Sequence, residues 1–208
     1  MVSNLALTIV EMLYNYRLMG LVGEGGVAAY GIIMYVAFVF GAIFYGYAMG
    51  SAPLIGFNYG ARNRGELQSL FRKSLTLILV TGVVMTTLAE LVSGPLVGLF
   101  AGYDPDLFAM TLRGFRLTSI TFLFMGVSAW GSSFFTALSN GLVSAAISFL
   151  RTLVFETGAV LLLPMVLGLD GVWLANPAAE LFSLLVTCCF FRRLGERYGY
   201  LGRTGEGA

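Results

Sequence analysis

Six long apolar segments, separated by short turn-forming clusters, constrain this chain more than any other feature of its sequence. A bilayer core needs roughly 20 apolar residues per helix, and each segment comes close to that length or exceeds it. We predict six membrane-spanning helices, at residues 4–22, 27–54, 71–100, 109–138, 142–167 and 171–191. With 58% hydrophobic and 11% charged residues, the composition lies outside the usual range of soluble domains. The predicted fold class is an all-α membrane protein.

Residues that usually build catalytic or metal sites are scarce. The chain has no histidine, and its two cysteines, Cys188 and Cys189, are neighbours in a predicted helix, where their side chains diverge. No CxxC, HExxH, phosphate-binding loop or GxSxG motif occurs in the sequence. A net charge of +1 gives no electrostatic case for binding nucleic acid. We therefore expect no enzymatic activity, no bound cofactor and no metal site.

Basic and acidic connections alternate along the chain, and this alternation predicts its orientation. The basic residues are Arg62, Arg64, Arg72 and Lys73 after the second segment, and Arg192, Arg193, Arg197 and Arg203 after the last. The other connections hold Glu24, Asp104 with Asp106, and Asp170, without lysine or arginine. Short cytoplasmic loops carry the excess of positive charge, so we expect a multi-pass plasma-membrane protein with both termini in the cytoplasm. Residues 1–191 would form the six-helix lobe and residues 192–208 a basic cytoplasmic tail.

Polar side chains recur at helical spacing on four of the segments, although polar groups are costly in a bilayer. The stripes are Asn4, Thr8, Glu11 and Asn15; Thr121, Ser128, Ser132, Thr136 and Ser139; Ser144, Ser148, Thr152 and Glu156; and Asn176, Glu180, Ser183 and Thr187. Hydroxyl groups alone are explained by hydrogen bonds between helices. A carboxyl group buried among neutral partners is a candidate proton carrier, and Glu11 is the first candidate. Arg151 is five residues from Glu156, a poor spacing for a pair on one helix, so it is expected to meet another helix.

The second segment ends in "GSAPLIGFNYGARN", residues 50–63. Within it, Pro53, Gly56, Asn58 and Gly60 predict a helix that bends, packs closely against a neighbour and leaves through a turn. This exit resembles the multidrug and toxic compound extrusion (MATE) transporters, in which a "P-I-G-Y-N-Y-G-A" type exit is typical. Further agreement lies in "GEGGVAAYGIIMYV" at 23–36, "FFTALSNG" at 134–141 and "LRTLVFETGAVLLLPMVLGLDGVWLANPAAELFS" at 150–183.

The resemblance implies the carboxy-terminal six-helix lobe of a twelve-helix transporter, whose two lobes rock about a central cavity. It implies export of small organic, cationic compounds across the lipid bilayer, in exchange for protons or sodium ions. The partner would be an amino-terminal lobe or a second half-transporter, and both a fragment and a half-size protein fit the sequence. Some family members carry a coupling glutamate near the level of Glu11 and pair it with an aspartate in the tenth helix. The corresponding stretch here, "FLFMGVSAWGSSFF", has no acid.

A substrate and ion-coupling cavity is expected where the polar stripes meet. Its predicted residues are Glu11, Tyr14, Asn15, Ser132, Glu156, Asn176 and Glu180. Two other functions stay open. One is a lipid-linked oligosaccharide flippase of the same broader superfamily, which needs several basic residues in its cavity. The other is an inactive, truncated membrane scaffold, whose polar stripes only join helices.

Overall fold

The protein, described here by a computed structural model, consists of helices and short turns over residues 2–201, which are the residues that the structure describes. The elements are α1 (Val2–Val22), α2 (Glu24–Gly60), α3 (Arg64–Ala101), α4 (Pro105–Ser119), α5 (Phe122–Ala137), α6 (Gly141–Phe149), η1 (Leu150–Glu156), α7 (Thr157–Leu167) and α8 (Leu169–Tyr198). Short turns join them, and these residues contain no strand. The prediction of an all-α fold is confirmed.

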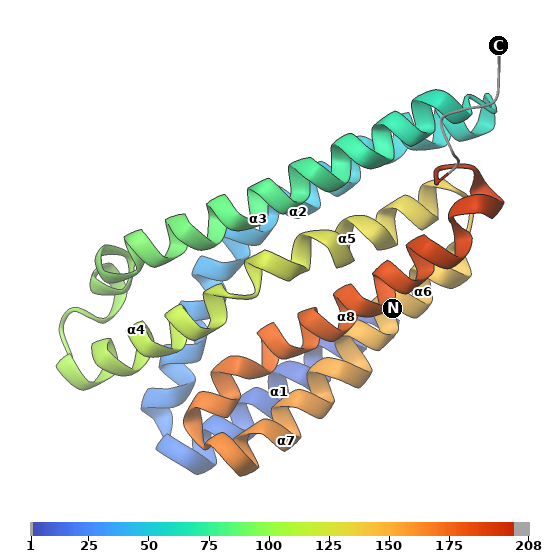
Figure 1. The fold of residues 1–208 in the computed structure, drawn as a ribbon. Helices are drawn as coiled ribbons and strands as arrows, with labels where there is room; N and C mark the ends of the chain where they lie inside the picture. The colour runs from blue at the N-terminus through green and yellow to red at the C-terminus, as the bar shows by residue number, and fades with distance from the viewer. Residues whose placement is uncertain (1, 202–208) are drawn as a thin grey trace.

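The helices group into six rods that correspond to the six predicted segments (Figure 1). In the fourth rod, α4 and α5 meet at a bend of 50°. In the fifth, α6, the π-helix η1 and α7 follow one another without a turn. Four rods have the length and apolar composition of a membrane span, and the bent α4–α5 pair makes a fifth. The 21-residue α1 is not among them, so the count of six holds only approximately by this measure.

Successive rods run back and forth, so the connections gather at two ends of the bundle (Figure 1). At one end, which we call the basic end, the turn at residues 61–63 and the turn at 139–140 lie beside the end of α8. Gln68 Nε2 donates to the Gly199 carbonyl at 2.9 Å there, and Asn140 Nδ2 donates to the Tyr198 hydroxyl at 2.9 Å. At the other, acidic end, Arg113 pairs with Asp170.

The predicted alternation of charge therefore separates the two ends of the bundle, although which end faces the cytoplasm stays a prediction. One boundary differs from the predicted one. The last helix does not end at residue 191 but continues to Tyr198, and Tyr200 beyond it is 1% exposed. The first part of the expected tail is thus helical and packed against the bundle. Residues 202–208 of that tail lie outside the described residues.

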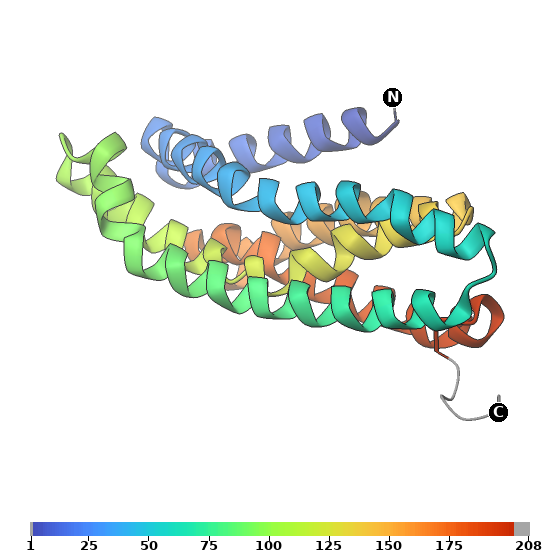
Figure 2. The same ribbon diagram turned by 90° about the horizontal axis from the view of Figure 1, so that it is seen from above.

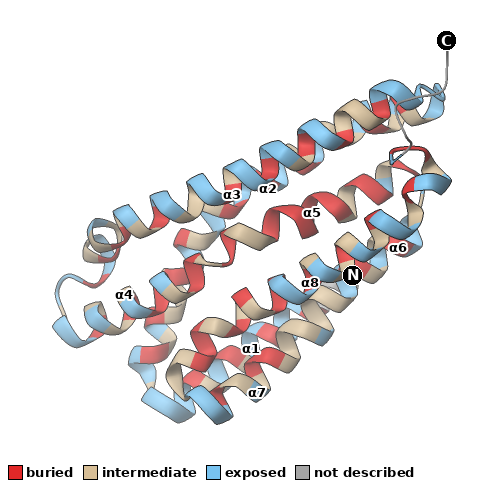
Figure 3. Cartoon of the chain, viewed as in Figure 1, coloured by how far each residue is buried: buried red, intermediate tan, exposed pale blue. Residues whose placement is uncertain are grey.

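Apolar side chains are both buried and exposed, as expected for a bundle with a lipid-facing surface (Figure 3). Val80, Val84 and Leu91 on α3 are more than half exposed. Figure 2 shows α3 and α1 on opposite sides of the lobe. Inside, two apolar clusters fill the bundle, one around Trp173 near the acidic end and one around Phe134 near the basic end.

The motif at the end of α2 forms the predicted exit but not the predicted close packing. α2 continues through Pro53 to Gly60, and a turn follows. The Asn58 side chain is buried and donates from Nδ2 to the Leu54 carbonyl at 2.9 Å, one turn back in the same helix. A Cβ added at Gly60 would meet nothing within 4 Å, and one at Gly56 would make an ordinary contact with the Ala137 carbonyl oxygen at 3.5 Å. These two glycines therefore allow no unusually close helix approach within the described lobe.

The close approaches occur at glycines elsewhere in the bundle. A Cβ at Gly82 on α3 would lie 2.9 Å from the Phe122 carbonyl oxygen, beside the bend between α4 and α5. A Cβ at Gly171 would collide with the Leu163 carbonyl oxygen, close to the turn that joins α7 to α8. Both approaches are too close for a side chain, so the backbones meet there because glycine is present.

Candidate functional site

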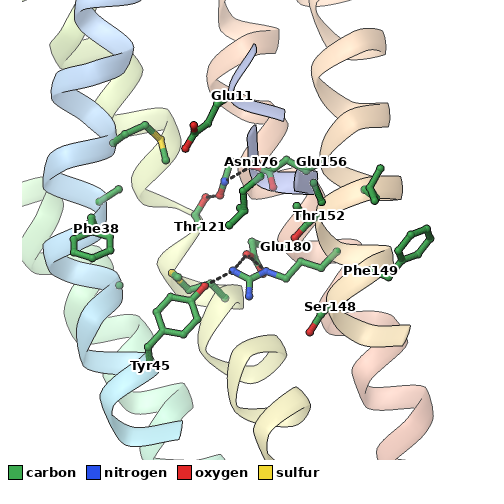
Figure 4. Close-up of a pocket in the computed structure, with 18 of the residues that line it drawn as sticks. Glu11, Phe38, Tyr45, Thr121, Ser148, Phe149, Thr152, Glu156, Asn176 and Glu180 are labelled. Carbon is green, nitrogen blue, oxygen red and sulfur yellow. Dashed lines mark hydrogen bonds and ion pairs between the residues drawn. The ribbon is translucent and has the colours of Figure 1, made fainter. Parts of the chain in front are cut away.

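A cavity of about 1010 Å³ lies in the middle of the lobe (Figure 4). Its walls come from α1, α2, the α4–α5 rod, α6, η1 and α8, whereas α3 and α7 contribute none of its lining residues. Met34, Phe38 and Met125 give it apolar walls, and the polar stripes of η1 and α8 face them. This volume is at the upper end of the range for pockets that hold drug-sized ligands, roughly 300–1,000 Å³.

The polar wall depends on η1, the π-helix in the middle of the fifth rod. Its wider turn places residues five apart on one face, unlike an α-helix. Arg151, Thr152 and Glu156 consequently all line the cavity. The spacing of an α-helix does not predict that Arg151 and Glu156 lie on the same face. No residue pattern in the segment indicates a π-helix. Short π-helical turns within α-helices are frequent at functional sites.

Arg151 forms a buried ion pair across the cavity wall with Glu180 of α8. Its Nη2 and Nε atoms each lie 2.6 Å from Glu180 Oε1, and Nη2 also donates to the Tyr45 hydroxyl of α2 at 3.0 Å. The side chains of Arg151 and Glu180 are only 19% and 4% exposed. The prediction that Arg151 meets another helix is confirmed. A buried carboxylate needs such a partner, because an unpaired buried charge is costly.

A second polar chain crosses the cavity from the bend in the fourth rod to the π-helix. Thr121 donates from Oγ1 to Asn176 Oδ1 at 2.8 Å, and Asn176 Nδ2 donates to Glu156 Oε1 at 3.0 Å (Figure 4). Thr121 lies between α4 and α5, and its backbone N–H bonds to the Thr118 carbonyl three residues back. The Asn176 amide therefore connects a carboxyl group in the cavity with a break in a helix.

Hydroxyl groups extend the polar wall towards the basic end. Ser132 Oγ lies 2.8 Å from Ser144 Oγ and 3.0 Å from Ser148 Oγ, and Thr136 Oγ1 donates to Ser144 Oγ at 2.7 Å. These bonds join α5 to α6, as expected when a hydroxyl stripe connects helices. Thr136, Ser144 and Ser148 also line the cavity, so the same groups bond the helices and face the hollow.

The predicted site residues separate into three groups. Glu11, Glu156, Asn176 and Glu180 line the cavity, and Ser132 bonds to two residues that line it. Tyr14 and Asn15 do not line it. Tyr14 is 2% exposed and stacks on Tyr30 of α2 with 4.8 Å between ring centroids. Asn15 is exposed one turn beyond Glu11, because the stripe on α1 continues past the edge of the cavity.

Thr121, Thr152 and Tyr45 are among the lining residues that the predicted site does not include. Thr121 and Thr152 belong to the polar stripes, so the sequence contains a signal for them. Tyr45 is an aromatic residue that can line a cavity for flat cations, and its hydroxyl accepts a hydrogen bond from Arg151. The side chain of Asn4, the first member of the α1 stripe, lies outside the described residues.

Comparison with known proteins gives a consistent result. The MatE family profile matches residues 1–159. The outward-facing conformation of a multidrug resistance MATE family transporter of the MOP superfamily superposes with a TM-score of 0.87 at 19% identity, covering 95% of this chain and 44% of that one. An inward-facing conformation of such a transporter gives 0.87 at 19% identity, with 96% and 46% covered.

A third structure is that of a MOP superfamily transporter from Pyrococcus furiosus, described as having a binding pocket of reverse polarity that suggests a different function. It superposes with a TM-score of 0.86 at 18% identity, covering 95% of this chain and 44% of that chain. This chain spans less than half the length of all three structures. No curated protein matches it.

Proposed function

This chain belongs to the MATE family of membrane transporters, and from that premise we propose that it forms one lobe of a secondary active multidrug exporter. The lobe would pair with a second six-helix lobe, either an amino-terminal lobe or another half-transporter. Its cavity would form part of the path of an organic cation, exchanged for protons or sodium ions. Alternating rotation of the two lobes would open that path to one side of the membrane at a time.

The charge of the cavity is the observation that carries this proposal. Among its described lining residues, Glu11, Glu156 and Glu180 are acidic and Arg151 is basic. Three carboxylates against one guanidinium leave an excess of two negative charges when all four groups are ionised. Aromatic side chains such as Phe38 and Tyr45 face the same space and suit the flat face of an organic cation.

Movement of the lobe as one body is supported by the superpositions. The chain matches one outward-facing and one inward-facing transporter structure with the same TM-score of 0.87. If a lobe were rebuilt during transport, one fixed lobe structure would fit the two states unequally. The comparison therefore favours a change between lobes, with smaller adjustments inside each one.

The flippase alternative is less well supported by the cavity. A lipid-linked oligosaccharide carries phosphate groups, which require basic partners. Arg151 is the one basic residue among the described residues that line the cavity, and Glu180 already neutralises it. An inactive scaffold does not need a large cavity with several carboxyl groups, because its polar groups would only have to bond helix to helix.

A transport assay with defined partners tests the proposal. The chain is reconstituted in liposomes alone, and together with a separately expressed amino-terminal six-helix lobe of a MATE transporter. We expect a fluorescent organic cation to move against its gradient in the combined vesicles when a proton or sodium gradient is imposed, and not in vesicles with the chain alone. Transport by a demonstrated monomer would contradict the need for a second lobe.

Three cavity variants and one matched control separate transport from scaffolding in the same assay. Glu11→Gln, Glu156→Gln and Glu180→Gln each remove one ionisable group from the cavity, whereas Glu24→Gln removes one from the first turn of α2, outside its lining residues. We expect Glu24→Gln to leave gradient-driven transport intact and at least one cavity variant to abolish it. Equal transport by all four variants would contradict a coupling role for this cavity.

A further inference from the structure

We propose that Glu156 is the coupling carboxyl group of this cavity and that the Asn176 amide transmits its protonation to the break between α4 and α5. The inference rests on the proposed transport function, but it concerns a change in structure that can be measured without transport. It begins from the hydrogen-bonded chain that joins Glu156, Asn176 and Thr121.

The three cavity glutamates differ in their surroundings, and Glu156 alone combines burial with a neutral partner. Glu180 already has a cation in contact, since Arg151 lies 2.6 Å from its Oε1 atom. Glu11 is exposed on α1 at the cavity wall, where solvent can stabilise its charge. Glu156 is partly buried, lines the cavity, and accepts a hydrogen bond from the neutral amide of Asn176.

Charged and titratable groups surround Glu156 from several helices. Arg151 lies on its own element, Glu180 on α8 and Glu11 on α1. The phenol groups of Tyr14 and Tyr30 also interact with it, from α1 and α2. Arg151 is in contact with Glu180 and compensates mainly that carboxylate. A proton on Glu156 therefore relieves the repulsion between the Glu156 carboxylate and the two other glutamates. One proton from cavity water binds a carboxylate oxygen, and no covalent bond within the chain breaks.

The Asn176 amide responds to that proton because its two ends differ. An ionised carboxylate only accepts hydrogen bonds, so it takes the Nδ2 donor and leaves Oδ1 to accept from Thr121. A protonated carboxyl group donates from its hydroxyl, and its best partner is Oδ1. Rotation of the Asn176 amide by half a turn places Oδ1 next to the protonated Glu156 and Nδ2 next to the Thr121 hydroxyl. The Thr121 oxygen then accepts a hydrogen bond from Nδ2 and no longer donates one to Asn176.

Thr121 connects the change of hydrogen-bond partners at Asn176 to the backbone of the fourth rod. It lies between α4 and α5, where the two helices meet at 50°. When its hydroxyl no longer donates to Asn176, that hydroxyl is free to donate to a carbonyl of the preceding turn, a bond that bends helices. Arg113, in the middle of α4, pairs with Asp170 in the first turn of α8, so this part of α4 is held to α8 while a change at the break alters the angle between α4 and α5. Protonation in the cavity thus becomes a change in the angle of a helix.

Infrared spectroscopy tests the assignment of the carboxyl group. The full chain in lipid nanodiscs is titrated, and the carbonyl-stretch band of protonated carboxyl groups is followed. We expect a titrating band that Glu156→Gln removes and that the matched control Glu11→Gln retains. A band that survives in Glu156→Gln and disappears in Glu11→Gln or Glu180→Gln would overturn the assignment.

Distance measurements between spin labels test the transmission to the helix break. Cys188 and Cys189 are replaced by alanine, and labels are placed on Ala109→Cys of α4 and Leu142→Cys at the start of α6, both exposed. We expect the distance distribution to shift with pH. The shift should be absent in Glu156→Gln, which should keep the low-pH distribution at every pH.

A second pair of variants isolates the hydroxyl group of Thr121 from its bulk. Thr121→Val keeps the shape and removes the hydroxyl, so the infrared band should remain while the distance shift is lost. Thr121→Ser keeps the hydroxyl and should restore the shift. A pH-dependent shift that persists in Thr121→Val would overturn the transmission, even if transport itself is present.

Discussion

The basic end of the lobe and the cavity beside it use the same helices, α5 and α8, in opposite ways. At the basic end, Phe71 of α3, Phe134 of α5 and Tyr200 after α8 form the middle of an aromatic cluster with ring centroids 4.7–5.3 Å apart. Further along the bundle, α5 and α8 line a space of about 1010 Å³. There, the Arg151–Glu180 ion pair and the hydrogen bonds of the Asn176 amide replace ring packing.

The lobe gains stability mainly from its aromatic cluster and can change its structure mainly at the cavity. Buried aromatic side chains contribute large apolar areas and keep one arrangement, because few other packings fill the same space. A hollow region lacks those contacts, so its side chains have more room to move. The aromatic cluster holds α5 and α8 together. We therefore expect hydrogen bonds in the cavity to change without loss of the fold.

Truncation of Phe134 gives the largest expected effect. Its side chain is 0% exposed and contacts five other rings, those of Phe71, Trp130, Phe135, Phe191 and Tyr200. Phe134→Ala should lower the free energy of unfolding by about 3–5 kcal/mol, the range for large-to-small changes in a core. Thermal unfolding in detergent, followed by circular dichroism, measures the loss.

The control for this comparison is Phe38→Ala in the cavity wall. Phe38 is 79% exposed, so its truncation should change the unfolding free energy little. Equal losses in the two variants would contradict the division of the lobe into a stabilising end and a hollow.

The ion pair in the cavity should show a smaller effect that depends on both partners. Arg151→Met leaves the Glu180 carboxylate buried without its cation, a change that costs about 3–5 kcal/mol for a fully buried pair. Because the Arg151 side chain is 19% exposed, we expect the loss to fall at or below the lower end of that range. The double variant Arg151→Met, Glu180→Leu should recover most of the stability. A double variant as unstable as the single one would show that the pair is needed for packing and not only for charge balance.

Gly82 of α3 packs against the helix break beside the cavity. A Cβ there would lie 2.9 Å from the Phe122 carbonyl oxygen, so Gly82→Ala should push α3 away from the helix break and cost about 1–3 kcal/mol. Gly46→Ala is the matched control, because a Cβ at Gly46 would meet nothing within 4 Å. Alanine favours a helix, so this control should be neutral or slightly stabilising. Unfolding of both variants in increasing sodium dodecyl sulfate compares them directly.

The sequence predicts the rods and most of the polar wall because both follow from spacing. Apolar length identifies the spans, and steps of four residues place Ser144, Ser148, Thr152 and Glu156 on one face, all of which line the cavity. The same reasoning fails at Asn15, since spacing gives the direction of a side chain and not where a cavity ends.

Other features depend on contacts between distant segments. The bend at Thr121 contains no proline or glycine that would predict it from the sequence. The π-helix that places Arg151 and Glu156 on one side likewise has no recognisable residue pattern. Small-residue spacing on α2 predicts close packing, yet the close approaches are at Gly82 and Gly171. A glycine allows close packing only where another helix lies against it. The sequence of one segment does not say where that other helix lies.

The smallest expected effect lies at the edge of the aromatic cluster, in the hydroxyl group of Tyr200. This hydroxyl donates to the Phe191 carbonyl at 3.0 Å, and the side chain is 1% exposed just beyond the end of α8. Tyr200→Phe keeps the ring and removes the bond, so it should cost about 0.5–1.5 kcal/mol near neutral pH.

The pH dependence of that cost separates the hydrogen bond from the ring packing. Burial raises the pKa of Tyr200 above its ordinary value, because it disfavours the charged phenolate. The stabilisation is therefore complete below the unfolded pKa of about 10, and it declines as the pH rises from there towards the folded pKa. The unfolding free energies of the native chain and of Tyr200→Phe, compared at neutral and strongly alkaline pH, should converge as the pH increases. The other tyrosines are common to both proteins and cancel in the difference. A difference that stays constant with pH would mean that the hydroxyl ionises as easily in the folded chain as in the unfolded one, and that this edge of the cluster is open to water.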